Sequence, residues 1–285
     1  MAKLLRWTGT VLGVVLILIL VAAAYVWIAS SQKLGARVEA RPEHLAVPTA
    51  AELADGPRQL RVLGCIACHG EGLRGKLFFD EPKVAQVYAP NLTLIAARAT
   101  DQQLAQAIRQ GVSHDGRALF IMPSAQYSRL TDGELASLIS AIRVQTKGGE
   151  QSPPIKLGPI GRIGVATGKF RTQPELVQEY AQNFPGDYGP QFARGRHLAL
   201  TGCSECHGPS LGGGEPKPGL KAPDLSIVGA YDLPAFTKLL RTGVPPTGKK
   251  LELMDEISKG DLSHMTDEEI AALHAFLVER AKRTP

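Results

Sequence analysis

Two stretches of the chain carry the same five-residue pattern, and together they use all four cysteines. They are Cys65-Ile66-Ala67-Cys68-His69 and Cys203-Ser204-Glu205-Cys206-His207. On a helix, residues three apart share a face, so the two thiols can form thioethers with two vinyl groups on one edge of a porphyrin. The histidine that follows can then place a ring nitrogen on the iron. This is the spacing of a c-type haem attachment site, and it predicts two covalently bound haem c groups.

Paired cysteines also occur in two other kinds of site. Two Cys-x-x-Cys pairs can form a four-thiolate zinc site, and a single pair can act as a thioredoxin-like redox couple. A zinc site would not explain why a histidine follows both pairs at the same offset. A redox couple would require a βαβ pattern, which the sequence around the pairs does not show. We therefore favour haem attachment.

A haem that transfers electrons needs a second axial ligand, because an open iron position binds small molecules. Methionine sulfur suits this position, and Met122 is the only methionine of the first half beyond the N-terminal apolar segment. The second half offers Met254 and Met265. Met254 follows Arg241 at the same interval at which Met122 follows Arg109. We expect Met122 and Met254 to be the distal ligands and Met265 to be core packing.

Other polar residues near the motifs are expected to have more ordinary roles. Arg109 and Arg241 occupy equivalent places, and each either pairs with haem propionates or is a solvated helix charge. Because each half already has a methionine in place, we do not expect axial ligation by the remaining histidines, which are His44, His114, His197, His264 and His274.

The two halves match beyond the cysteine pattern, which indicates an internal repeat. Gly64 to Gly75 aligns with Gly202 to Gly213, and Ala89-Pro90-Asn91-Leu92-Thr93 aligns with Ala222-Pro223-Asp224-Leu225-Ser226. Near the end of each half, Thr-Asp-x-Glu forms a capping box that opens a helix. We predict two copies of one domain of normal size.

The helices expected in each copy point to an all-α fold. Residues 53–63 and 192–200 should form short helices that lead into the two motifs. Thr100 is a suitable N-cap for a helix over residues 101–110, and Gly111 should end it. No strand signal rivals these patterns, so we predict an N-terminal transmembrane helix followed by two tandem all-α haem domains.

An apolar, uncharged stretch lies close to the N-terminus. It is roughly 20 residues long, or about 30 Å as a helix, which is enough to cross a bilayer. Ala22-Ala23-Ala24 offers a cleavage position, but a secretory signal usually has a shorter apolar core. We expect an uncleaved anchor and divide the chain into a cytoplasmic N-terminus (1–7), a transmembrane anchor (8–29), a stalk (30–50), a first haem domain (51–146), a connector (147–186) and a second haem domain (187–285).

The connector and the overall charge bear on how the chain packs and what it binds. The connector is rich in proline and glycine, and its apolar residues indicate that it packs against the domains.

The formal charge is +5, but each haem would add two carboxylates. The chain has no dense lysine and arginine run of the kind that nucleic-acid binding prefers. We expect no nucleic-acid partner.

On these motifs, residues 51–285 resemble the membrane-anchored dihaem cytochromes c, which are built from two class I cytochrome c-like domains. Such subunits often serve periplasmic alcohol, aldehyde or sugar-acid dehydrogenases, and many carry three haems where this chain has two motifs. The resemblance implies thioethers at Cys65, Cys68, Cys203 and Cys206. It also implies proximal ligation by His69 and His207, and distal ligation by Met122 and Met254.

The resemblance also implies a location and a function. Haem is attached outside the bacterial cytoplasm, so we expect a single-pass inner-membrane protein, in contact with membrane lipid, whose haem domains lie in the periplasm. We predict an electron carrier, not an enzyme, that works between redox proteins such as a dehydrogenase, an oxidase or a soluble cytochrome, alone or as a subunit of a complex. The alternatives are a dihaem peroxidase, which needs one haem without a firm sixth ligand, and a haem-based sensor or scaffold.

Overall fold

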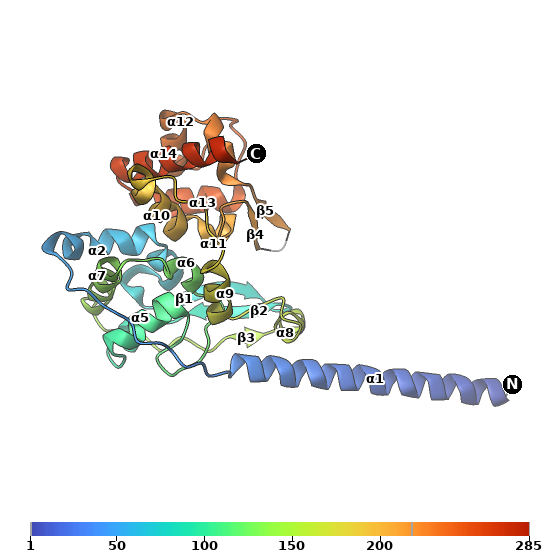
Figure 1. The fold of residues 1–285 in the computed structure, drawn as a ribbon. Helices are drawn as coiled ribbons and strands as arrows, with labels where there is room; N and C mark the ends of the chain where they lie inside the picture. Colours follow the sequence, from blue (N-terminus) through green and yellow to red (C-terminus); the bar gives the residue numbers. More distant parts are fainter. Residues whose placement is uncertain (1, 218, 285) are drawn as a thin grey trace.

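One long helix projects from the rest of the chain in the computed structural model, which describes residues 2–217 and 219–284 (Figure 1). This helix, α1 (Ala2–Leu34), is exposed along its apolar length. Within Arg6–Leu34, an 18-residue window has a mean hydropathy of 2.9, and none of that window is buried. A helix of this length and composition fits either a membrane anchor or a signal sequence.

Two lobes follow α1, and each surrounds its own apolar core. The first lobe runs from residue 36 to residue 181, and its core includes Leu60, Leu104 and Leu135. Its cysteine motif forms a short helix that directly follows a longer one. Up to residue 143, the helical elements of this lobe are α2 (Ala50–Val62), α3 (Cys65–His69), η1 (Glu71–Leu73), α4 (Leu92–Ala96), α5 (Asp101–Gln110), α6 (Ser124–Tyr127) and α7 (Asp132–Arg143).

The second lobe repeats this order over residues 190–284. Its core is built around Phe276, Ile270 and Leu273, with Val62 of the first lobe joining it from across the interface. Its helical elements are η2 (Pro190–Phe192), α10 (Ala193–Gly202), α11 (Ser204–His207), η3 (Leu225–Ala230), α12 (Leu233–Thr242), α13 (Glu252–Gly260), η4 (Leu262–His264) and α14 (Asp267–Arg283).

The helix boundaries predicted from capping signals are confirmed. Thr100 caps α5, and Gly111 ends it in the left-handed conformation at φ 70°. The capping boxes that open with Thr131 and Thr266 start α7 and α14. Helix α2 begins three residues before the predicted start, because Thr49 forms a further capping box with Glu52.

The predicted all-α class is too narrow, because the chain also forms two small antiparallel sheets. In the first lobe β1 (Lys76–Glu81) pairs with β2 (Ala85–Ala89), and β2 also pairs with β3 (Lys156–Leu157). In the second lobe β4 (Gly214–Lys217) pairs with β5 (Leu220–Ala222). Every residue of β1 is exposed, so the strand lacks the apolar alternation by which a half-buried strand is recognised.

The connector packs against the first lobe, as its apolar content predicted. It contains β3 and two helices that the sequence did not indicate, α8 (Pro159–Ala166) and α9 (Gln173–Tyr180). Helix α9 contacts α5 and α6, and α8 contacts α1. Glycines that looked like chain breakers are instead sites of close approach, since a Cβ on Gly161 would lie 2.0 Å from the Val84 carbonyl oxygen.

The segment expected to be a stalk lies along the first lobe. Helix α1 continues to Leu34, so the first residues of this segment are helical. Beyond it, the Val38 amide donates to the Gly116 carbonyl at 2.9 Å, and the Arg41 amide donates to Gln110 Oε1 at 2.9 Å. Leu45 packs against the first core. These contacts tie the chain to the lobe from the end of α1 onward.

Candidate functional site

The first cysteine motif presents one histidine nitrogen in a form suited to a metal. Helix α3 carries Cys65, Cys68 and His69, and the histidine is 7% exposed. His69 Nδ1 lies 2.8 Å from the Pro90 carbonyl oxygen, which can only accept a hydrogen bond. Nδ1 therefore carries the proton, and the lone pair of Nε2 remains for a ligand. Burial lowers the pKa of His69, which favours the neutral, metal-binding form.

A cavity of about 780 Å³ adjoins this motif, within the size range of cofactor sites. Cys65, Cys68, His69 and Met122 all line it, so the structure brings the four predicted residues of the first site to one cavity. The walls are largely aliphatic, and they include Leu92, Ile95, Leu104, Ile108, Leu138 and Ile142. The donor set, the volume and the apolar walls fit a haem attached through both thiols.

Two arginines of this cavity were not identified from the sequence. Arg98, His114 and Arg117 line it, and no motif had marked Arg98 or Arg117. Arg117 is paired with Asp115 at 2.8 Å. Arg98 is exposed, and within the described part of the chain it has no ion-pair partner. A guanidinium in this place can pair with the carboxylates of a haem.

The second motif repeats the histidine geometry of the first. His207 on α11 is 9% exposed, and its Nδ1 lies 2.8 Å from the Pro223 carbonyl oxygen. Burial lowers the pKa of His207 as well. Cys203 and Met254 both pack against the second core. The donor types therefore match those of the first site, and iron ligation by Met254 remains a prediction.

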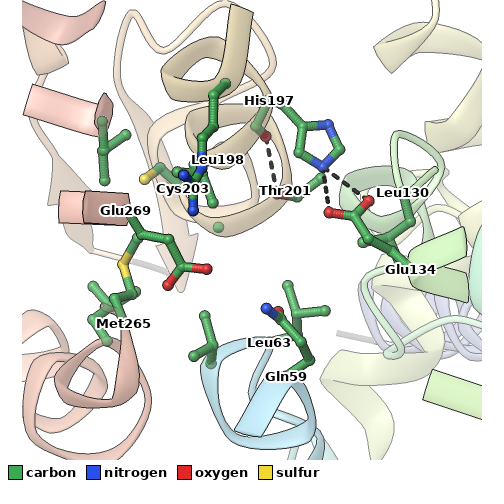
Figure 2. A pocket seen from close by; sticks show the side chains of 15 residues that line it. Gln59, Leu63, Leu130, Glu134, His197, Leu198, Thr201, Cys203, Met265 and Glu269 are labelled. Carbon is green, nitrogen blue, oxygen red and sulfur yellow. Dashed lines mark hydrogen bonds and ion pairs between the residues drawn. The ribbon is translucent and has the colours of Figure 1, made fainter. Parts of the chain in front are cut away.

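Met265 has a different environment from Met254. It is 4% exposed within the second core, whereas Met254 is half-buried on α13. Met265 and Cys203 line a cavity of about 150 Å³ between the lobes, which is too small for a porphyrin (Figure 2). This burial agrees with the packing role predicted for Met265.

The repeat extends to unusual backbone conformations just after each histidine. Gly70 and Gly208 both have φ 77°, and Leu73 and Leu211 have φ 55° and 63°. A leucine in this left-handed region costs of order 1–3 kcal/mol, so its surroundings must hold it there. Both leucines are completely buried. The two lobes thus share one strained loop. Its glycines and leucines match between the two halves of the sequence, but the left-handed conformation of the leucines is visible only in the structure.

The pKa values of the thiols argue against a redox couple, and the placement of the cysteines argues against a zinc site. Burial raises the pKa of Cys65 and of Cys203 to about 12, and that of Cys206 to about 11. Reactive redox cysteines have lowered pKa values, so these thiols do not fit a redox couple. Over residues 2–217 and 219–284, no three His, Cys, Asp or Glu side chains are placed to hold a metal ion. The two cysteine pairs therefore do not combine into a zinc site.

Helix α6, which begins two residues after Met122, connects the two motifs. The Tyr127 hydroxyl donates to the Leu63 carbonyl, two residues before Cys65. Gln126 Oε1 accepts a hydrogen bond of 2.9 Å from the backbone N–H of Glu205, inside the second motif. Glu205 also lines the first cavity. The second motif therefore abuts the first site.

A hydrogen bond and an ion pair hold the lobes together around the small cavity. His197 Nε2 on α10 lies 2.8 Å from Glu134 of α7 (Figure 2). Arg58 of α2 contacts Glu269 of α14 at 2.8 Å and also pairs with Asp55. The Arg58–Glu269 pair is 211 residues apart in sequence, so no local pattern could reveal it.

Arg109 and Arg241 have equivalent protein partners, a role that is neither of the two expected from the sequence. Arg109 binds Asp132 at 2.8 Å and Glu43 at 2.9 Å. Arg241 binds Asp267 at 2.8 Å. Asp132 and Asp267 are the first residues of α7 and α14. Each arginine thus fastens the last helix of its lobe instead of standing free as a solvated charge.

Comparison with known proteins agrees with this site chemistry. Residues 192–281 match the family model for cytochrome c, so the second lobe contains a cytochrome c domain, which implies covalently bound haem c. The chain is similar to the fructose dehydrogenase cytochrome subunit of Gluconobacter japonicus, with 25% identity over 241 residues that cover 75% of this chain and 49% of that subunit.

A second relative is a subunit of the nicotinate dehydrogenase of Pseudomonas putida, with 26% identity over 229 residues that cover 74% of this chain and 18% of the relative. The chain thus spans about half the length of the first relative and less than a fifth of the second. The cytochrome c domain and these similarities support electron transfer, and they agree with a carrier more than with a catalytic subunit.

Proposed function

We propose that this chain is an electron carrier that binds two c-type haems, one in each lobe, and is held at a membrane by α1. One observation carries the proposal. Each lobe has a buried histidine that follows two thiols and whose Nδ1 is turned to a proline carbonyl at 2.8 Å. A duplicated arrangement of this kind serves a duplicated ligand.

The residues of each site have distinct tasks. When bound, haem supplies an iron that gains and loses one electron reversibly. Cys65 and Cys68 hold the porphyrin edge, and the Pro90 carbonyl fixes the tautomer and ring orientation of His69. Met122 lines the same cavity, and a thioether ligand favours the reduced iron. Cys203, Cys206, His207 and Met254 have the same tasks in the second lobe.

The contacts of α1 with the folded lobe support an uncleaved anchor. Ser30 is completely buried, and Arg162 of α8 donates to Ser30 Oγ at 2.9 Å. The Arg162 guanidinium also lies 3.5 Å from the centroid of the Trp27 ring. Cleavage near either residue would remove these contacts. We therefore infer a single-pass anchor in the bacterial inner membrane, with both lobes in the periplasm.

The partners follow from the chemistry and from the names of the relatives. Both relatives are named as subunits of dehydrogenases, one of them as a cytochrome subunit. We infer that this chain receives electrons from a dehydrogenase and passes them to another redox protein, within a larger complex or by transient contact. Among the candidate acceptors are an oxidase and a soluble cytochrome.

Intact-mass measurement and resonance Raman spectroscopy of the protein from its native host test the proposal together. We expect the added mass of two haems and two six-coordinate, low-spin irons with histidine and methionine ligands. An added mass of one haem or none would contradict the dihaem carrier. One five-coordinate haem beside a six-coordinate one would favour the peroxidase instead.

A further inference from the structure

Helix α8 exposes an apolar face that no other described part of the chain covers. Ile160 is 53% exposed, Ile163 is 50% exposed, and Phe170, which follows the helix, is 37% exposed. Residues three apart on a helix are neighbours, so the two isoleucines lie on one side. We call Ile160, Ile163 and Phe170 the α8 face. An apolar face on so short a helix requires an explanation.

Backbone contacts determine which way α8 turns this face. The Gly158 amide donates to the Val84 carbonyl at 2.9 Å, and the Ile160 amide donates to the Lys83 carbonyl at 2.9 Å. Gly161 lies so close to Val84 that a side chain would not fit between them. Val165, 1% exposed, packs on the inner side. The helix therefore cannot rotate to bury Ile160 and Ile163.

The same helix is bound to α1 at the end of its apolar stretch. Arg162 bonds to Ser30 and Ser31 and stacks over Trp27. Helix α1 has 33 residues, about 50 Å at 1.5 Å per residue, against a hydrocarbon core of about 30 Å. Its last turns therefore leave the hydrocarbon near Trp27, a residue type that prefers the interface. Figure 1 shows α8 beside this part of α1.

Basic side chains surround the α8 face. Lys169 is exposed next to Phe170, and the Lys33 ammonium lies close to Gly168, 3.8 Å from the place of a Cβ. Arg162, between the two isoleucines in sequence, is bound to α1 and is not one of these headgroup-facing cations. Helices that lie in the membrane surface combine an apolar face with lysines and arginines that meet anionic headgroups.

We propose that the α8 face lies in the headgroup region of the bilayer that α1 crosses, with Ile160, Ile163 and Phe170 against acyl chains. This inference rests on the proposed anchor. It gives the first lobe a second attachment to the membrane and so limits its rotation about α1. Leu34 at the end of α1 lines the first cavity, so this attachment also keeps that cavity near the membrane surface.

Photocrosslinking of the full chain in lipid nanodiscs that contain phosphatidylglycerol tests the inference. Benzoylphenylalanine replaces Ile163 in one protein, Leu18 of α1 in a second, and Val144 in a third. Val144, the residue after the last residue of α7, is 75% exposed and does not belong to the α8 face. We expect lipid adducts, detected by mass spectrometry, from positions 18 and 163, and several-fold fewer from position 144.

The outcomes separate the inference from the anchor on which it rests. Adducts at 18 without adducts at 163 would overturn the inference and leave the anchor intact. Absence of adducts at 18 would overturn the anchor itself. Adducts at 163 to protein instead of lipid would mark a protein-docking surface and also overturn the inference. Adding Ile160→Asp to the protein labelled at 163 should reduce its lipid adducts several-fold, because a carboxylate resists entry into an anionic surface.

Discussion

The two methionines of the second lobe offer a direct test of the ligand assignment, because one is predicted to bind iron and the other to pack. The perturbation is the same for both: Met254→Leu and Met265→Leu. Leucine keeps the apolar volume and removes the sulfur. Met254→Leu should therefore abolish thioether ligation at one haem, and Met265→Leu should leave both haems unchanged.

Burial sets the expected effects on stability. Met265 is 4% exposed within the second core, so its replacement by leucine should lower the free energy of unfolding by less than about 1.5 kcal/mol. Met265→Ala creates a cavity and should cost about 2–5 kcal/mol. Met254 is half-buried on α13, so Met254→Leu should change packing little. Its main effect should be a lower reduction potential, because histidine and methionine ligation raises the potential.

Near-infrared magnetic circular dichroism detects methionine sulfur on ferric haem, a redox titration resolves the two potentials, and denaturant unfolding measures stability. Met122→Leu is the matched control, since it should remove the same signal from the first site. The expected pattern is one lost methionine signal in Met254→Leu, two retained signals in Met265→Leu, and reduced stability with both signals in Met265→Ala.

Two results would refute the reasoning. If Met265→Leu removed the sulfur signal and Met254→Leu kept it, Met265 would be the distal ligand of the second haem. The equal spacing of Arg109 from Met122 and of Arg241 from Met254 would then not identify the ligand. If neither substitution changed the spectrum, the second haem would have no methionine ligand at all.

Three further predictions concern the interface between the lobes. Arg58→Met leaves the buried Glu269 carboxylate without its arginine partner, so the free energy of unfolding in urea should fall by about 2–4 kcal/mol. An unchanged unfolding midpoint would show that this ion pair does not stabilise the protein. Gln126→Leu removes the acceptor of the Glu205 amide, which should lose protection in hydrogen exchange while both haems stay bound. Asp261 is buried against the first motif, and burial raises its pKa from 3.8 to about 6. Below about pH 4 this carboxyl is neutral in the folded and the unfolded state. Between about pH 4 and 6 it ionises first in the unfolded state, so the free energy of unfolding should fall as the pH rises. Asp261→Asn should remove this fall and add up to about 2 kcal/mol at pH 8, and equal pH profiles of the two proteins would contradict it.

The secondary structure shows which predictions local sequence can support. The helices opened by Thr100, Thr131 and Thr266 begin where predicted, because a capping box lies within four consecutive residues. The strands were missed because their partners are remote or their pattern is irregular. Strand β3 has two residues and pairs with β2 across about 70 residues of chain, an arrangement that no local periodicity signals.

The residues around the sites divide in the same way. The spacing of Cys65, Cys68 and His69 is a local property, and it predicted the attachment chemistry. Arg98 at the cavity wall and Glu205 from the opposite lobe carried no such signal. Their places depend on how separate helices pack, so they became visible only in three dimensions.

By itself the sequence determined the repeated cysteine and histidine chemistry, the capped helices and an apolar segment long enough to span a bilayer, because each depends on residues that are neighbours along the chain. Only the tertiary structure decided that Arg109 and Arg241 bind aspartates, that the second motif abuts the first cavity, and that α8 lies against α1. These features join residues far apart in sequence. They arise when apolar cores form and bring charged and polar side chains within contact distance.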